Sequence, residues 1–148
     1  DCVAPFLREE INRGPLLGSG EYSHVYEVES FDILTAHGSV QDAKWNAEEL
    51  EKRRLMKECE KYRQTNNARY AMKHIKKEYF DASVEGYDSD AYVQAVCDLT
   101  LEAEILASLA HPNIIKLRGA THSGVDGFSL GPGGYFLIID RLFETLDQ

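Results

Sequence analysis

Residues 91–109 carry the feature that most restricts the fold of this chain. The run "AYVQAVCDLTLEAEILASL" contains no Pro or Gly and repeats apolar residues at helical spacing, which gives a helix one apolar face. The residues on that face are Val96, Leu99, Ala103, Leu106 and Leu109. Pro112 disfavours helical geometry at His111, so the helix is predicted to end in the sequence "HPN". An amphipathic helix of this kind has to bury its apolar face against another element.

Short segments with strand character supply that element. Residues 14–28, "GPLLGSGEYSHVYEV", predict a hairpin, and the segments 69–75, 114–120 and 135–140 each predict a strand. Alternation in the strand "RYAMKHI" places Ala71, Lys73 and Ile75 on one face, and Tyr70, Met72 and His74 on the other. We therefore expect an α+β fold in which one long helix packs on a sheet formed by these five strands.

Composition limits the function classes. The 148 residues fit one domain, and the net charge of −9 argues against nucleic acid as a partner, because phosphate binding needs clustered Lys and Arg. The three cysteines, Cys2, Cys59 and Cys97, match neither a disulfide framework nor a zinc motif. We expect no membrane partner, because no apolar stretch is long enough to cross a bilayer, and since the start "DCVAPFLREE" is no signal peptide the expected location is cytoplasmic or left open. The first residue is Asp rather than Met, so a fragment of a longer chain is expected.

Residues 41–64 differ from the rest of the chain. This segment holds seven bases and six acids without Pro or Gly, and it predicts a charged helix. Its apolar residues Trp45, Leu50, Leu55 and Met56 form only a thin stripe. We interpret it as a solvated helix within an insertion at about residues 32–67, between the second and third strands. A partner-binding helix is the alternative.

Three further features point to chemistry. Gly18 and Gly20 lie in "LGSGEYSHV", Lys73 lies in "YAMK", and Glu102 lies in "TLEAEILASLAHPNII". A Gly-x-Gly sequence alone is more often a turn than a nucleotide loop. Together and in this order, followed by "FLIIDRLFETL", these segments resemble the N-terminal lobe of a eukaryotic-type protein kinase domain, from about Leu16 to Leu146.

The resemblance implies a twisted, five-stranded antiparallel sheet with one long helix against it, and an ATP site. Lys73 is expected to contact the α and β phosphates and Glu102 to hold Lys73 by an ion pair, with Glu104 pointing elsewhere. Glycines let backbone N–H groups approach a triphosphate without a Cβ in the way. The nucleotide-binding residues implied by the resemblance are Leu17, Gly18, Ser19, Gly20, Val25, Ala71, Lys73, Ile139, Asp140 and Leu142. In that set Leu17, Val25, Ala71 and Ile139 line the adenine slot, and the backbones of Asp140 and Leu142 meet the adenine edge.

The sequence also departs from the family pattern. Ser23 stands where a third glycine is usual, and Gly18 and Lys73 are 55 positions apart, longer than is typical. The chain has no H-R-D, D-F-G or A-P-E motif. We therefore expect the catalytic base and the Mg²⁺ ligands in a C-lobe absent from this sequence, and the chain alone to be inactive.

Three functions remain open at this point. The first is the ATP-binding lobe of an active protein kinase whose substrate is a protein, with the resemblance favouring Ser/Thr over Tyr. The second is a pseudokinase, that is, a regulatory module that keeps the lobe without turnover. The third is an interaction domain unrelated to kinases, in which the helix at 41–64 is the functional part.

Overall fold

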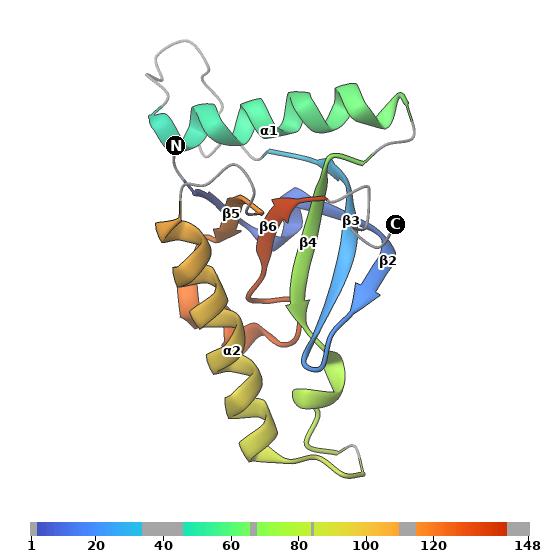
Figure 1. Cartoon of the computed structure of the whole chain (residues 1–148), viewed down its shortest axis with the longest axis vertical. Coiled ribbons are helices and arrows are strands. Elements are labelled where there is room, and N and C mark those ends of the chain that lie inside the picture. The colour runs from blue at the N-terminus through green and yellow to red at the C-terminus, as the bar shows by residue number, and fades with distance from the viewer. Residues whose placement is uncertain (1–2, 34–45, 66–67, 84, 110–114, 142–148) are drawn as a thin grey trace.

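The computed structural model describes residues 3–33, 46–65, 68–83, 85–109 and 115–141, and it has α+β architecture (Figure 1). A mixed six-stranded sheet runs in the order β1-β5-β6-β4-β3-β2. The strands are β1 (Ala4–Phe6), β2 (Ile11–Ser19), β3 (Ser23–Phe31), β4 (Tyr70–Ile75), β5 (Leu117–Thr121) and β6 (Leu137–Asp140). The described residues also form two α-helices, α1 (Ala47–Arg63) and α2 (Ser89–Ser108). They include three 3-10 helices as well, η1 (Arg8–Glu10), η2 (Lys77–Tyr79) and η3 (Gly124–Leu130).

The prediction of five antiparallel strands is wrong, because β1 adds a sixth strand that runs parallel to β5. Five consecutive strand segments were predicted, but Ala4–Phe6 has only three residues, too few to show alternation. Its place is fixed by packing instead. Phe6 is fully buried and lies against Gly119 of β5, where a Cβ would come within 2.6 Å of the Phe6 ring. Gly119 is therefore required for β1 to lie beside β5.

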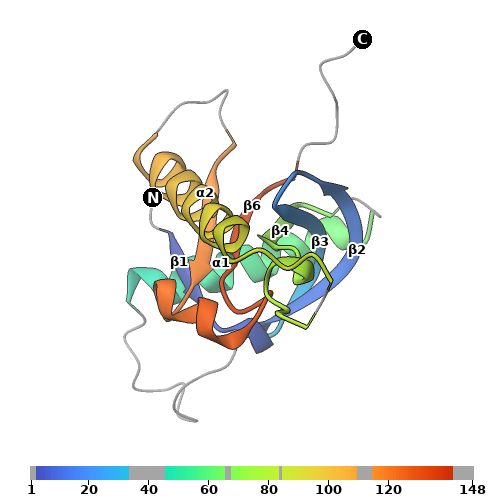
Figure 2. The same cartoon turned by 90° about the horizontal axis from the view of Figure 1, so that it is seen from below.

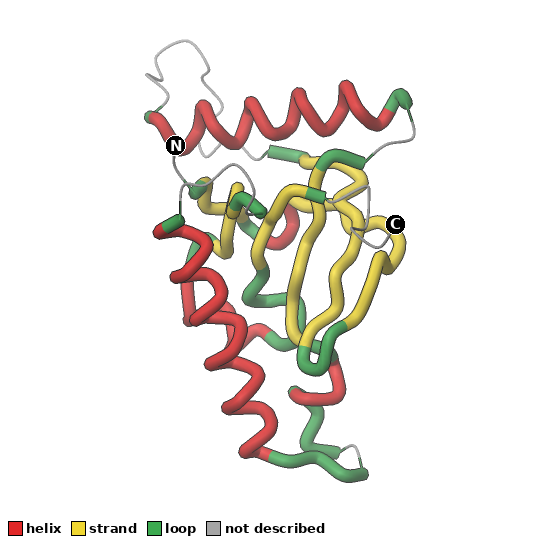
Figure 3. The backbone as a smooth tube through the Cα atoms, in the orientation of Figure 1, coloured by secondary structure: helices red, strands yellow, loops and turns green. Residues whose placement is uncertain are grey.

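Both faces of the sheet are buried, as the alternation in β4 predicts. Tyr70 and Met72 belong to one hydrophobic cluster together with Leu55 of α1. Ala71 and Ile75 belong to a second cluster together with Leu99 of α2. Figures 1 and 3 show α1 lying crosswise to the strands at one end of the sheet and α2 running along the molecule beside it. The sheet thus separates an α1 side from an α2 side.

The predicted charged helix is present as α1, but it is solvated on only part of its surface. Helix α1 packs against β1 and β3 and buries Lys52, Leu55 and Cys59. These residues have the i, i+3, i+7 spacing of one helix face, but one of them, Lys52, does not count as apolar in a hydropathy pattern. Leu50, which does count, is 53% exposed. Trp45 lies outside the described residues.

Lys52 is buried because it has a buried partner. Its Nζ atom lies 2.7 Å from Glu10 Oε1 and 2.9 Å from Oε2, and Glu10 is fully buried. Glu10 Oε1 also accepts the Leu7 backbone N–H at 2.8 Å. A buried charge is tolerated when it is paired and hydrogen-bonded in this way. The pair ties α1 to η1 at the edge of the sheet.

Cys59 of α1 is a packing residue. It is 1% exposed, and its thiol donates to the carbonyl oxygens of Val28 and Glu29. Burial raises the pKa of the Cys59 thiol to about 11, so the thiol stays protonated at neutral pH.

Helix α2 corresponds to the predicted helix at 91–109 and begins two residues earlier. Asp88 is its N-cap and accepts the Asp90 backbone N–H at 2.9 Å. The predicted stop at His111–Asn113 lies outside the described residues. Among the helices that the structure describes, none is both long and apolar enough to cross a bilayer.

Candidate functional site

Lys73 and Glu102 meet between the sheet and α2. Lys73 lies in the middle of β4, on the α2 side of the sheet with Ala71 and Ile75, and its Nζ atom is 2.7 Å from Glu102 Oε2. The two side chains are 22% and 32% exposed, so the pair is shielded by protein but accessible to solvent. The contact expected from the sequence is therefore present. It joins β4 to α2 through two residues that are 29 positions apart along the chain.

Glu102 rather than Glu104 makes this contact. Residues two positions apart on an α-helix are about 200° apart around its axis. Glu104 therefore faces away from Lys73, and it is exposed. A partly exposed ion pair of this kind contributes about 0–1 kcal/mol to stability. Its consequence is geometric, because it fixes the position of a long and flexible ammonium side chain.

The glycines lie at the same level of the sheet as Lys73. Gly18 of β2 pairs with Val25 of β3, Val25 pairs with Lys73, and Lys73 pairs with Leu137 of β6. Adjacent strands are about 4.8 Å apart, so the Gly18 backbone lies roughly 10 Å from that of Lys73, across one strand. Residues 18–23, here called the glycine turn, close with a hydrogen bond from the Gly20 N–H to the Ser23 carbonyl at 2.9 Å.

Neither Gly18 nor Gly20 is required by the packing of the described residues. Neither has a left-handed φ, in contrast to Gly86, Gly124 and Gly131. A Cβ added at Gly18 or Gly20 would meet no described atom within 4 Å. The surface above this turn is thus open to close approach by a molecule outside the chain.

The residues expected around an adenine lie on the same side of the sheet. Ala71 pairs with Ile139 in register, and both are buried in the α2-side cluster, 2% and 8% exposed. Val25 packs against that cluster and is half-buried. Leu17 lies in the irregular part of β2 and is 38% exposed. The structure therefore brings Val25, Ala71 and Ile139 together near Lys73.

The last residues of β6 are held by ion pairs that sequence reasoning missed. Arg118 of β5 binds the Asp140 carboxylate through two contacts, at 2.9 and 3.3 Å. Arg141 donates to Glu27 Oε1 at 2.6 Å, and its backbone N–H donates to the Arg69 carbonyl. No local pattern signals pairs between residues so distant in sequence. Leu142, the other residue expected at the adenine edge, lies outside the described residues.

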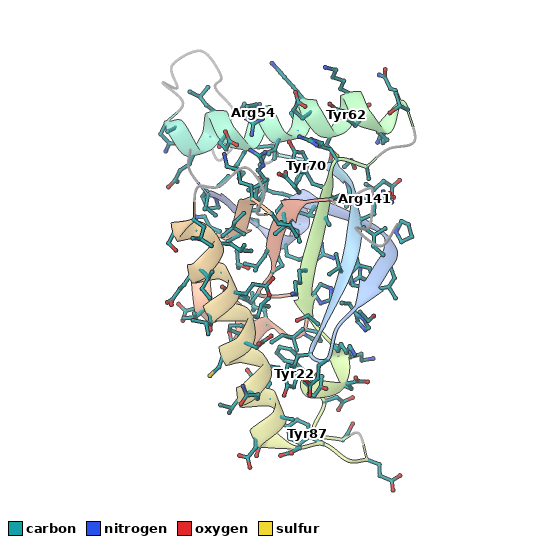
Figure 4. The ribbon with its side chains drawn as sticks, in the orientation of Figure 1. Tyr22, Arg54, Tyr62, Tyr70, Tyr87 and Arg141 are labelled. Carbon is teal, nitrogen blue, oxygen red and sulfur yellow. The ribbon has the colours of Figure 1, made fainter. Side chains whose placement is uncertain are left out.

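A second unpredicted feature attaches the glycine turn to α2. The Tyr79 hydroxyl of η2 donates to the Glu21 carbonyl at 3.0 Å, and the rings of Tyr79 and Tyr22 meet edge to face with centroids 5.5 Å apart. The next residue, Phe80, packs edge to face on Tyr92 of α2 at 5.2 Å. Figure 2 shows the segment after β4 between the β2–β3 turn and α2, and Figure 4 labels Tyr22 at this junction. The turn and the helix that carries Glu102 are therefore linked through η2.

On the opposite face of β4, His74 holds β2 in place. Arg13 of β2 donates from Nη1 to His74 Nε2 at 2.9 Å, because a guanidinium only donates. His74 Nδ1 then carries the proton and donates to the Ile75 carbonyl at 3.0 Å. Burial lowers the pKa of His74, and the nearby charge of Arg13 lowers it further. The neutral ring stacks on Tyr26 at 5.1 Å, so Arg13, Tyr26 and His74 connect three adjacent strands below the glycine turn.

Ser19 of the glycine turn also has a partner within the chain. Its Oγ atom lies 2.7 Å from His24 Nδ1, across the β2–β3 pair. This contact fixes the Ser19 side chain, so a ligand at the turn would meet the Ser19 backbone more readily than its hydroxyl.

No group of three His, Cys, Asp or Glu side chains within the described ranges is arranged as a metal site. The comparisons with known proteins add no assignment, because no protein-family model matches the sequence and no curated protein matches it. Function is therefore inferred from the geometry of Lys73, Glu102 and the glycine turn.

Proposed function

We propose that this chain is the ATP-binding lobe of a protein kinase. The observation that carries the proposal is the ion pair between Lys73 and Glu102, held between β4 and α2 at the level of Gly18. An ammonium fixed by a carboxylate, on the strand one removed from an exposed glycine turn, suits a triphosphate, because phosphates take a point charge from a lysine and hydrogen bonds from backbone N–H groups.

The apolar residues support the same proposal. Ala71 and Ile139 belong to the apolar cluster on the Lys73 side of the sheet and Val25 packs against it, and a purine ring is bound by apolar side chains of this kind. The contacts of Asp140 with Arg118 hold the end of β6, whose backbone would meet the polar edge of the base.

Phosphoryl transfer needs more groups than these. The sequence contains no H-R-D or D-F-G motif, so the proposal assigns the catalytic base and the Mg²⁺ ligands to a second lobe outside these 148 residues. In the assembled enzyme a protein Ser or Thr hydroxyl would attack the γ-phosphorus of ATP, leaving ADP. The part of this chain in that reaction is to bind and orient the α and β phosphates.

The glycine turn gives the proposal its first test. We expect Gly18→Ala to lower the affinity for ATP at least fivefold, because its Cβ would occupy the space through which phosphates approach the backbone. The unfolding free energy should change by less than about 1 kcal/mol, since the added methyl meets no described atom within 4 Å and the φ suits any residue. ATP binding is followed by NMR titration, and stability by urea unfolding.

Gly119→Ala is the matched control. Its Cβ would collide with the Phe6 ring, so we expect a loss of roughly 1–3 kcal/mol in unfolding free energy, without selective loss of ATP binding by the protein that remains folded. If Gly18→Ala binds ATP as tightly as the parent chain, or is destabilised as much as Gly119→Ala, the turn serves the fold and the proposed site is wrong.

A further inference from the structure

Helix α2 has a second apolar stripe, on the side away from the sheet. It consists of Val93, Cys97, Leu101 and Ile105, each four positions after the one before, and is called here the outer stripe. Val93 and Leu101 are each 56% exposed, Ile105 is 47% exposed, and Cys97 is exposed. Single exposed apolar residues are common on protein surfaces, but four in one row on one helix form a patch.

The outer stripe is separate from the face that holds the fold. Ala95 and Leu99, which are fully buried against the sheet, lie on the opposite side of the helix axis. Figure 1 shows α2 along the margin of the molecule, with the sheet to one side. At about 1.5 Å per residue the stripe is about 18 Å long, which corresponds to more than three helical turns.

The charge around the outer stripe has one sign. Asp90, Asp98 and Glu104 are exposed and border the stripe. The whole helix, Ser89–Ser108, contains no Lys or Arg. A surface of this kind complements an apolar row flanked by positive charges.

We propose that the outer stripe binds a basic amphipathic helix of a partner protein. A row of side chains at i, i+4 spacing fits the anchors at i, i+3, i+4 and i+7 of such a helix. The acidic border would pair with the Lys or Arg residues of the partner helix. A second copy of the chain is disfavoured, because two outer stripes in contact would bring acidic borders together. An anionic membrane surface is disfavoured because it repels the same carboxylates. This surface is distinct from the proposed ATP site, since Glu102 lies on a different side of α2.

The test uses two synthetic helical peptides as probes. Both carry the same leucine row at i, i+4 spacing, flanked by lysines in one and by glutamates in the other, and binding to the full 148-residue chain is measured by fluorescence anisotropy. We expect the lysine peptide to bind at least tenfold more tightly than the glutamate peptide. The lysine peptide should also slow alkylation of exposed Cys97, whereas Cys59 is buried and serves as the unreactive reference.

Variants of the stripe locate the binding. The double variant Leu101→Gln with Ile105→Gln should weaken the lysine peptide at least tenfold, and Leu50→Gln on α1, which removes an equally exposed leucine, should not. Gln keeps helix propensity, and circular dichroism and urea unfolding verify that the double variant is folded. Equal binding by both variants means nonspecific attraction to an acidic protein and overturns the proposal.

Two other results also overturn it. Self-association in sedimentation experiments that the double variant abolishes would make a second copy the occupant. Binding to phosphatidylserine vesicles that the double variant abolishes would make a membrane the occupant. Because neither Lys73 nor the glycine turn is altered, ATP titration of the double variant separates failure of this proposal from failure of the ATP site.

Discussion

Replacing Lys73 with Met is expected to lower the affinity of the chain for ATP at least tenfold. The substitution removes an ammonium that Glu102 holds in place, and a hydrogen bond to a charged group contributes about 1.5–3 kcal/mol. Stability should fall by no more than about 1 kcal/mol, because the lost ion pair is partly exposed. ATP affinity is measured by NMR titration and stability by urea unfolding.

Two further variants test the arrangement of the pair. Glu102→Gln keeps the Lys73 charge but replaces a charged acceptor with a neutral one, so we expect a smaller loss of affinity than for Lys73→Met. Lys77→Met removes an exposed charge from neighbouring η2 and should leave the affinity within twofold. If Lys77→Met and Lys73→Met weaken ATP equally, the effect comes from net charge and the proposed role of Lys73 is wrong.

Removing one partner of the buried ion pair between Glu10 and Lys52 is expected to be the most destabilising single change discussed for this chain. Lys52→Met leaves the Glu10 carboxylate, which is fully buried, without its cation. A broken buried pair costs roughly 3–5 kcal/mol, a large part of the 5–15 kcal/mol by which domains are usually stable. The measurement is the free energy of unfolding in urea at neutral pH.

The double variant Glu10→Gln with Lys52→Met distinguishes the two possible reasons for this loss. If the loss comes from an unpaired buried charge, removing the carboxylate as well should restore more than half of it. Arg63→Met is the control, because Arg63 pairs with Glu60 on the exposed side of the same helix and should cost less than about 1 kcal/mol. Equal losses for Lys52→Met and Arg63→Met would show that burial of the pair does not add to its contribution to stability.

Periodicity predicted the central elements because their faces are chemically distinct. Tyr70, Met72 and His74 alternate with Ala71, Lys73 and Ile75, and the structure places the two sets on opposite sides of the sheet, with all but Lys73 buried. The contact between Lys73 and Glu102 was expected from motif order, and it forms because the buried side of α2, with Ala95 and Leu99, packs against the sheet and brings Glu102 over β4. Their roles in binding ATP remain proposals.

Other features depend on pairings that no local pattern encodes. Strand β1 has three residues and is placed by the fit of Phe6 over Gly119. From its sequence alone, helix α1 is expected to be solvated, because one of the residues that it buries is Lys52. The partner of this lysine, Glu10, lies 42 positions away. The link from Tyr79 to the glycine turn likewise spans 58 positions. Each of these depends on two segments that are brought together only by the completed sheet.

The most direct test of the proposed ATP site is affinity labelling with an acyl phosphate of ATP. When such a nucleotide is bound, a lysine amine near the phosphates attacks the acyl carbon, forming an amide on the lysine and releasing the nucleotide. Mass spectrometry of the digested chain then identifies the acylated residue. We expect acylation mainly at Lys73, suppressed by excess ATP. Acylation spread over the exposed lysines and unchanged by ATP would contradict it.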